Sequence, residues 1–287
     1  MHSHKCIRHR VLAKALKGRF VENIDVIDEY VATVGANPFK LVFLDQKGWA
    51  ATPMEKLKPF VSERPCELLF NLMTSFLTRF VDREDLAPSY QALYGRPGVL
   101  ERIRALPKGT GEREEAAVEE YCKSLRDVCG FLHISRAVVM DAKKERVRYY
   151  MIFATNSLHG IEVFKDAEAA AAETQDEVRH QTQSKNEGPF LPFGTLKSRK
   201  VADLHQRYVR RLRKNIVKVL SSGKSVVAYD DLYSEAMEFP LVTPNDLEEL
   251  LRALEPNIQI QREGPRRKKL LLFNNDRILV LNSKALK

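Results

Sequence analysis

Two groups of cationic side chains near the end of this chain are the residues best suited to bind a charged partner. One group shares a stretch with helical spacing: Arg207, Arg210, Arg211 and Lys214. The other group is consecutive: Arg266, Arg267, Lys268 and Lys269. Guanidinium and ammonium groups bind phosphate oxygens, which supplies affinity but little sequence information. We therefore expect polyanion binding, with a nucleic acid as the partner.

The net charge of the chain has the same distribution. The sequence carries +9 at pH 7, and residues 196–287 carry +8 of it, with 19 lysines and arginines against 11 aspartates and glutamates. A basic excess confined to one part of a chain favours polyanion binding over a general effect on solubility. A solvated basic surface without a partner is the alternative.

The cysteines, histidines and glycines of the sequence do not form a motif typical of a metal site or a nucleotide-binding loop. The four cysteines include no Cys-x-x-Cys pair, and the seven histidines are dispersed apart from a terminal trio. We expect reduced, mostly buried thiols and no metal site. The single Gly-x-Gly, Gly109-Thr110-Gly111, follows Pro107 instead of a strand, so we interpret it as a turn and not as a nucleotide loop.

Length and hydropathy predict a globular protein. A chain of 287 residues with 44% hydrophobic content can form two domains. No apolar run approaches the roughly 20 residues that cross a bilayer. The basic start lacks the apolar core of a secretory signal. We expect a cytoplasmic protein that does not contact a membrane.

The elements that would position the candidate residues begin with alternating helices and strands. Apolar residues repeat at helical spacing over 23–34, and 39–44 is a short apolar run of the kind found in strands buried between helices. A helix over 53–60, a second apolar run over 66–73 and a helix over 74–81 follow. This alternation predicts a parallel sheet.

The next part of the chain predicts a surface segment, a long helix and a hairpin. Residues 82–108 are rich in proline and glycine, so we expect a surface excursion with short helical pieces. An acidic first turn opens a helix over 112–128. The spacing of 134–140 and 147–154 favours an antiparallel hairpin, and a long helix over 160–183 follows.

A linker separates these elements from a second domain. Residues 186–195 contain two glycines and two prolines and show neither the helical nor the strand periodicity of hydrophobic residues. We therefore divide the chain into an α/β domain at 1–185, the linker at 186–195 and a basic domain at 196–287.

The order of elements in the basic domain predicts a winged helix. A helix that begins near 201 carries apolar residues at four-residue spacing beside its cations. A second helix spans 229–237, and a third begins after Thr243, a good N-cap. Strands over 258–262 and 269–274 complete the order, so the cations at 266–269 lie on the wing.

The third helix of this domain is acidic, which argues against base reading. It carries Asp246, Glu248, Glu249 and Glu255 against Arg252 alone. Acidic side chains facing phosphates repel them. We expect the wing and the first helix to hold nucleic acid. A winged helix that only braces the other domain or a partner protein is the alternative.

Three motifs, taken in order, resemble one bacterial family. They are Phe-Lys-Leu-Val-Phe-Leu-Asp-Gln-Lys-Gly-Trp at 39–49, Cys-Glu-Leu-Leu-Phe-Asn-Leu-Met at 66–73 and Arg-Tyr-Tyr-Met-Ile-Phe-Ala-Thr-Asn at 148–156. The set resembles the three-Cys-motif partner family from about residue 18 to the C-terminus. The resemblance implies an α/β fold: the C-terminal part of a Rossmann-like methyltransferase sheet followed by an α+β winged-helix domain.

The resemblance also implies roles for individual residues. It makes 39–45 the fourth strand of the methyltransferase sheet, 66–73 the fifth, and the hairpin the final antiparallel pair. Asp45 would lie where the carboxyl end of its strand meets the substrate pocket, with Gly48 and Trp49 as further catalytic candidates. The family typically has Asp-Pro-x-Gly where this chain has Asp-Gln-Lys-Gly, so the rigid turn is altered. Asp45 as an N-cap or turn residue and Trp49 as a core or pocket-wall residue are the alternatives.

The cofactor that the resemblance implies is S-adenosylmethionine, with no metal. The first strands of such a fold and their glycine-rich cofactor loop are not visible in the sequence. The chain therefore looks like the back two-thirds of a longer enzyme, either a truncated reading frame or one piece of a split gene. Residues 39–44 would form an open apolar edge, which we expect a partner protein to cover.

Three hypotheses of function follow. The first is a three-Cys-motif partner family protein, a methyltransferase that acts on a nucleic acid or a macromolecular partner, with Asp45 near the reacting centre and the wing holding the substrate. The second is a non-catalytic module whose winged helix binds nucleic acid or protein. The third is a structural subunit covered by a partner on its open sheet edge.

Overall fold

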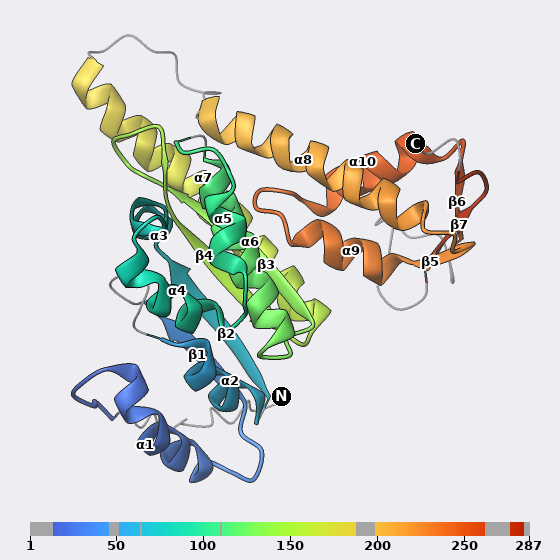
Figure 1. Cartoon of the computed structure of the whole chain (residues 1–287). Helices are drawn as coiled ribbons and strands as arrows, with labels where there is room; N and C mark the ends of the chain where they lie inside the picture. Colours follow the sequence, from blue (N-terminus) through green and yellow to red (C-terminus); the bar gives the residue numbers. More distant parts are fainter. Residues whose placement is uncertain are drawn as a thin grey trace, which may run out of the picture.

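A computed structural model of the chain describes residues 14–45, 52–63, 65–109, 111–187, 199–261 and 276–283. These residues form an α/β unit followed by a smaller C-terminal unit of three helices and three short strands (Figure 1). No helix in the described ranges is long and apolar enough to span a membrane.

A four-stranded mixed sheet forms the centre of the α/β unit. Its order is β1-β2-β4-β3, with β1 at Lys40–Leu44, β2 at Cys66–Leu72, β4 at Val147–Thr155 and β3 at His133–Met140. β1 and β2 are parallel, whereas β4 runs antiparallel to both β2 and β3. The two buried runs and the hairpin predicted from the sequence are confirmed as strands.

A buried lysine fixes the first two helices to β1. Lys40 donates from Nζ to Asp28 of α1 (Phe20–Ala32) at 3.3 Å and to the Phe60 carbonyl of α2 (Met54–Ser62). A buried ammonium group needs such partners because an unpaired buried charge is costly. The contact therefore holds both helices against the start of the sheet.

β1 is an edge strand that leaves an apolar face open. Among the described residues it pairs with β2 alone. Its inward residues are buried, whereas Phe39, Leu41 and Phe43 are exposed by 61%, 66% and 57%. The exposed apolar edge expected from the sequence is therefore present in the described part of the chain.

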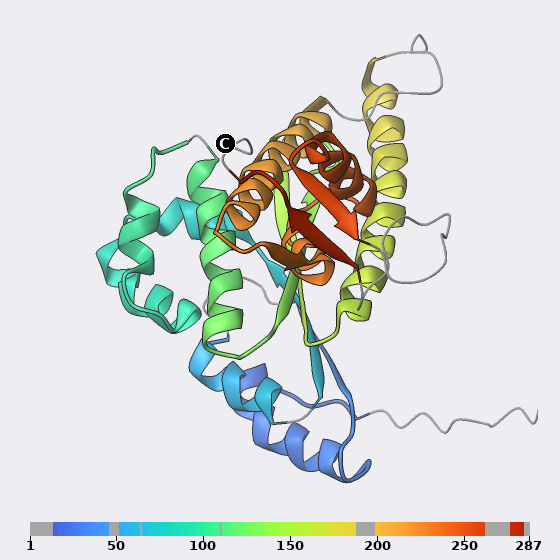
Figure 2. The ribbon, with the colours of Figure 1, turned by 90° about the vertical axis from the view of Figure 1, so that its right-hand side faces the viewer.

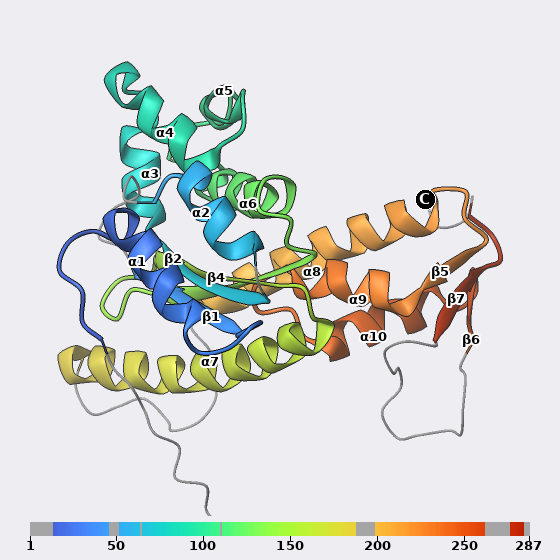
Figure 3. The same cartoon turned by 90° about the horizontal axis from the view of Figure 1, so that it is seen from below.

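Helices cover both faces of the sheet. α3 (Thr74–Phe80), α4 (Ala87–Tyr94), α5 (Val99–Arg104) and α6 (Glu112–Asp127) lie on the same side as α2, and the 30-residue α7 (Leu158–Glu187) runs along the opposite side (Figure 3). Phe164 of α7 stacks on Phe153 of β4 with ring centroids 5.0 Å apart.

The short helical pieces predicted at 82–108 are confirmed, but they pack into the core and do not form the expected surface excursion. The segment contains a 3-10 turn, η1 (Glu84–Leu86), with α4 and α5, and these helices bury Tyr90, Tyr94 and Ile103. Tyr94 donates from its hydroxyl to the Ala117 carbonyl of α6 at 3.1 Å. Pro88 lies in the first turn of α4, Gly95 ends α4 and Gly98 precedes α5, so these residues begin or end short helices that pack into the core.

The C-terminal unit combines helices with a second sheet. Its elements are α8 (Arg199–Leu220), β5 (Val226–Ala228), α9 (Tyr229–Met237), α10 (Pro244–Leu254), β6 (Ile258–Gln261) and β7 (Arg277–Val280). The sheet order is β5-β7-β6, with antiparallel pairing throughout. β5 was not predicted, because a strand of three residues is too short to show a recognisable alternation of apolar and polar residues. The predicted return strand at 269–274 lies outside the described residues, and the strand observed opposite β6 is β7.

Side chains join the two units across β3 and α7. Ser135 of β3 donates to the Met237 carbonyl at 2.6 Å, and Arg136 donates from Nε to the Glu238 carbonyl at 2.8 Å. α7 also lies beside the C-terminal unit (Figure 2). It continues to Glu187, into the predicted linker, whose remaining residues are outside the described ranges.

The apolar stripe of α8 gives a test of this packing. Leu212 is fully buried, whereas Arg213 beside it is exposed. Leu212→Ala leaves a cavity, so we expect it to lower the free energy of unfolding by about 3 kcal/mol. Arg213→Ala should change it by less than about 0.5 kcal/mol. Urea unfolding of both variants checks this, and equal effects would contradict the described orientation of α8.

Candidate functional site

Asp45 and Asn71 meet at the carboxyl edge of the parallel strands. Asp45 follows β1, Asn71 lies near the end of β2, and the register pairs Leu44 with Phe70. Adjacent parallel strands end at the same sheet edge, which is the usual ligand edge of α/β sheets. Asn71 donates from Nδ2 to Asp45 Oδ1 at 2.7 Å. The structure thus gives the predicted residue Asp45 a polar neighbour.

The Asn71 side chain has an acceptor atom without a partner. Its residue is 7% exposed, and Oδ1 is buried with no hydrogen-bond partner among the described residues. A buried carbonyl oxygen without a donor is destabilising. Together with the Asp45 carboxylate it presents acceptors, so this carboxyl edge suits a group that donates hydrogen bonds, such as an amine.

Only part of this carboxyl edge was predicted from the sequence. Gly48 and Trp49 lie outside the described residues, so their relation to Asp45 stays a prediction. Asn71 was not singled out. The signal was present, because Asn71 is an amide within the otherwise apolar second half of β2, where a parallel buried strand is usually apolar throughout.

A second polar pair lies where β2 continues into α3. Thr74, the first residue of α3, is fully buried and donates from Oγ1 to Glu114 Oε1 at the start of α6. Burial raises the pKa of the Glu114 carboxyl, and the Thr74 hydroxyl partly offsets this by stabilising the charged form. The pair links the start of α3 to the start of α6.

The cations of α8 form a row with two environments. Arg207, Arg211, Lys214 and Lys218 recur at i, i+4, i+7 and i+11, so they share one side of the helix. Arg211 pairs with Glu115 at 3.1 Å and with Glu119 at 2.8 Å, both on α6. Arg207 pairs with Glu115 as well. The first half of the row is therefore neutralised by α6.

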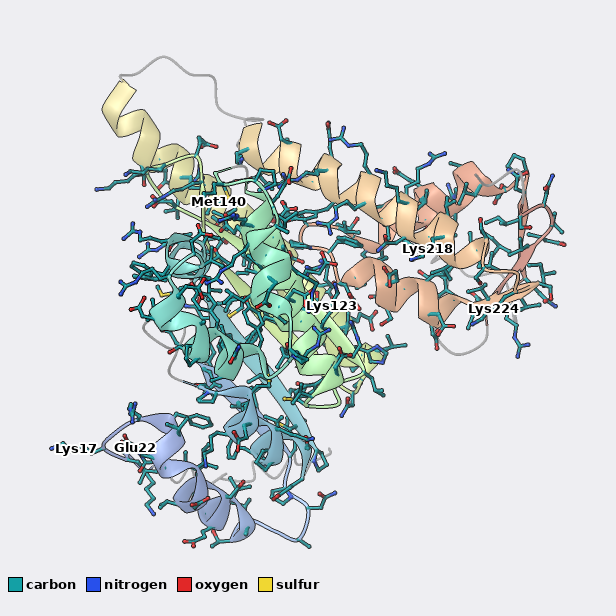
Figure 4. All side chains as sticks on the ribbon, viewed as in Figure 1. Lys17, Glu22, Lys123, Met140, Lys218 and Lys224 are labelled. Atoms are coloured by element: carbon teal, nitrogen blue, oxygen red, sulfur yellow. The ribbon has the colours of Figure 1, made fainter. Side chains whose placement is uncertain are left out.

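The second half of the row faces solvent. Lys214 and Lys218 are exposed, and so are Arg210 and Arg213 on the outer side of α8. No acidic partner for these residues occurs in the described ranges. Figure 4 shows Lys218 in the C-terminal half of α8, away from α6, which carries Lys123. Of the predicted nucleic-acid ligands on α8, Arg210 and Lys214 are thus available to a partner, whereas Arg207 and Arg211 are engaged.

The structure does not describe the other four cations that were predicted to bind nucleic acid. Arg266, Arg267, Lys268 and Lys269 lie outside the described residues, so their role stays a prediction. α10 carries the expected acidic residues. Asp246 accepts from the Thr243 backbone nitrogen at 2.7 Å and lies 3.1 Å from His205 Nε2. Part of the negative charge of α10 therefore serves to cap the helix and to bind α8.

The described residues do not gather into a metal site, and the described thiols are protonated. No group of three or more His, Cys, Asp or Glu residues in the described ranges is arranged to hold a metal ion. Burial raises the pKa of Cys66 and Cys122 to about 11 each and that of Cys129 to about 12. These thiols are poor nucleophiles at neutral pH, because the thiolate is the reactive form.

Comparison of the chain with known protein families, with curated proteins and with solved structures finds no match.

The partly buried Glu114 carboxyl makes the stability of the fold depend on pH. Its pKa is raised in the folded state, so the folded chain binds more protons than the unfolded chain as the pH rises above the ordinary carboxyl pKa of 4.5. Relative to Glu114→Gln, the wild type should therefore lose stability with rising pH through that window. Denaturant unfolding from pH 4 to 8 measures the difference. Glu101→Gln at an exposed position of α5 is the control, and parallel curves for wild type and Glu114→Gln would refute the assignment.

Proposed function

We propose that the chain is the substrate-holding part of a methyltransferase-like protein of the three-Cys-motif partner kind, and that its substrate is a nucleic acid. The observation that carries the proposal is the sheet order β1-β2-β4-β3 with an antiparallel β4. This is the order expected when the fourth and fifth strands of a Rossmann-like methyltransferase sheet are followed by its final hairpin. The carboxyl edge at Asp45 and Asn71 is then the substrate edge.

The C-terminal unit supports the nucleic-acid part of the proposal. Its order of helix, strand, two helices and two strands, with sheet order β5-β7-β6, is the order of a winged helix. Arg210, Arg213, Lys214 and Lys218 give α8 an exposed basic surface. Phosphate contacts from such a surface hold a duplex without reading its sequence. The cations at 266–269 lie outside the described residues, and their contribution to phosphate binding stays a prediction.

The described carboxyl edge does not fit S-adenosylmethionine by itself. Binding the cofactor in such folds uses a glycine-rich turn between a strand and a helix. Gly109 and Gly111 follow α5 and precede α6, so they form a helix-to-helix turn. Asp45 and Asn71 offer acceptors for an amine but no cradle for the cofactor. We therefore place no step of a reaction on residues of this chain that would require the bound cofactor.

The open edge of β1 indicates where a cofactor-binding part would join. Phe39, Leu41 and Phe43 are exposed on a strand with one unpaired edge in the described structure. A partner chain that adds a parallel strand there would extend the sheet and bury these side chains. The carboxyl end of the added strand would lie next to Asp45. In the proposal, this partner supplies the cofactor.

A non-catalytic nucleic-acid-binding module is the second candidate. The observation that favours it is the same carboxyl edge, which lacks a cofactor cradle in the described residues. The two candidates share the basic surface of α8 and differ in whether a cofactor-binding partner exists.

The DNA-binding surface is tested by two pairs of variants on one helix. Arg210→Gln with Lys214→Gln removes exposed cations, so the slope of log affinity against log salt for a mixed-sequence DNA duplex should become shallower by about 2. Arg207→Gln with Arg211→Gln removes cations held by α6, so it should lower stability and leave the slope within about 0.5 of wild type. Fluorescence anisotropy at several salt concentrations measures both. Equal slopes for the wild type and the first pair would overturn the assignment.

A further inference from the structure

A cavity of about 610 Å³ lies between the α/β unit and the C-terminal unit. Its walls come from α7, from the N-terminal half of α8 and from the segment that leads into α10. Figure 2 shows α7 alongside the C-terminal unit, and residues of that unit line the rest of the cavity. Ligand cavities in proteins commonly have volumes of about 300–1,000 Å³ and lie preferentially at domain interfaces. This cavity is separate from the carboxyl edge at Asp45.

One part of the cavity wall is apolar. Ala169 and Ala172 of α7, Val201 of α8 and the residues Leu241 and Val242 before α10 line it. Val201 and Val242 are buried. This part suits the hydrocarbon body of a ligand and not a hydrated ion.

The other part of the wall is negative. Five carboxylates line the cavity: Asp166, Glu168, Glu173, Asp176 and Asp246. The lining holds one lysine, Lys165, whose ammonium group pairs with Glu168, and both side chains are buried, with 5% and 6% exposed. The lysine charge is thus neutralised within the wall. The remaining carboxylates give the cavity a negative charge in a chain that carries +9 overall.

The wall is held in place by hydrogen bonds. Glu168 accepts from the Leu241 backbone nitrogen at 2.9 Å, and Lys165 donates to the Phe239 carbonyl at 3.1 Å. Leu241 has φ of 64°, a left-handed conformation that costs energy for a leucine. The buried pair maintains this conformation. The wall is therefore formed before a ligand arrives.

The start of α10 does not make the cavity an anion site. Asp246 accepts from the backbone nitrogen and the hydroxyl of Thr243, both at 2.7 Å, and it also meets His205 at 3.1 Å. A carboxylate in the first turn compensates the positive end of the helix dipole. The net electrostatic character of the lining stays negative.

We propose that this cavity binds a small organic cation with an apolar body, the ammonium group lying near Asp166 and Glu173 and the body against the apolar wall. The inference is independent of the proposed function, since it rests on the lining of a different site. Charge complementarity selects a cation, and the apolar wall selects one with a hydrocarbon part.

The test compares 2-phenylethylammonium with its neutral counterpart 2-phenylethanol on the full chain. We expect the cation to bind at least about tenfold more tightly, because the two probes differ mainly in charge. Calorimetric titration measures both affinities. Equal affinities, or no saturable binding of the cation by the folded chain, would overturn the proposal.

Substitutions in the cavity wall test where on the protein the cation binds. Asp166→Asn with Glu173→Gln should weaken cation binding at least about fivefold, whereas Glu177→Gln, exposed on α7 outside the lining, should leave it unchanged. Ala172→Phe fills the cavity and should abolish binding. Thermal unfolding establishes that each variant is folded. Undiminished binding by folded forms of both the double variant and Ala172→Phe would show that the cation binds elsewhere.

Discussion

Arg136 and Lys165 are buried cations of the α/β unit, and both donate to the segment between α9 and α10. Their acceptors are the backbone carbonyls of Glu238 and Phe239, at 2.8 and 3.1 Å. A buried charge that loses its partner is strongly destabilising. The segment after α9 must therefore stay against β3 and α7. The placement of the whole C-terminal unit depends on this constraint, as does the wall of the cavity beside α7.

This placement divides the cations of α8 between two roles. The apolar stripe around Leu212 faces the core of the C-terminal unit, and the helix lies close enough to α6 for Arg207 and Arg211 to reach Glu115. These ion pairs are partly exposed, so each contributes less than about 1 kcal/mol, and packing holds the helix. The cations beyond α6, such as Lys214, keep their charge available to a polyanion.

Local pattern was sufficient to predict most elements but not their partners. The apolar runs of β1 and β2 and the stripe of α8 follow from residue spacing alone. The interpretation of 82–108 as a surface excursion was wrong, because prolines and glycines that begin or end short buried helices look the same in sequence as those of a surface loop. Asn71 and the pairing of Arg211 with α6 depend on contacts between residues far apart in the chain. A periodicity in one segment carries no information about such contacts.

We propose that this chain holds the substrate, while the cofactor-binding part comes from a partner at the β1 edge. Calorimetric titration of S-adenosylmethionine into the purified chain, with thermal unfolding to establish that it is folded, tests this most directly. We predict no saturable binding by the folded chain. Saturable binding that Asp45→Ala abolishes would contradict the claim, because the carboxyl edge of this chain would then hold the cofactor without a partner.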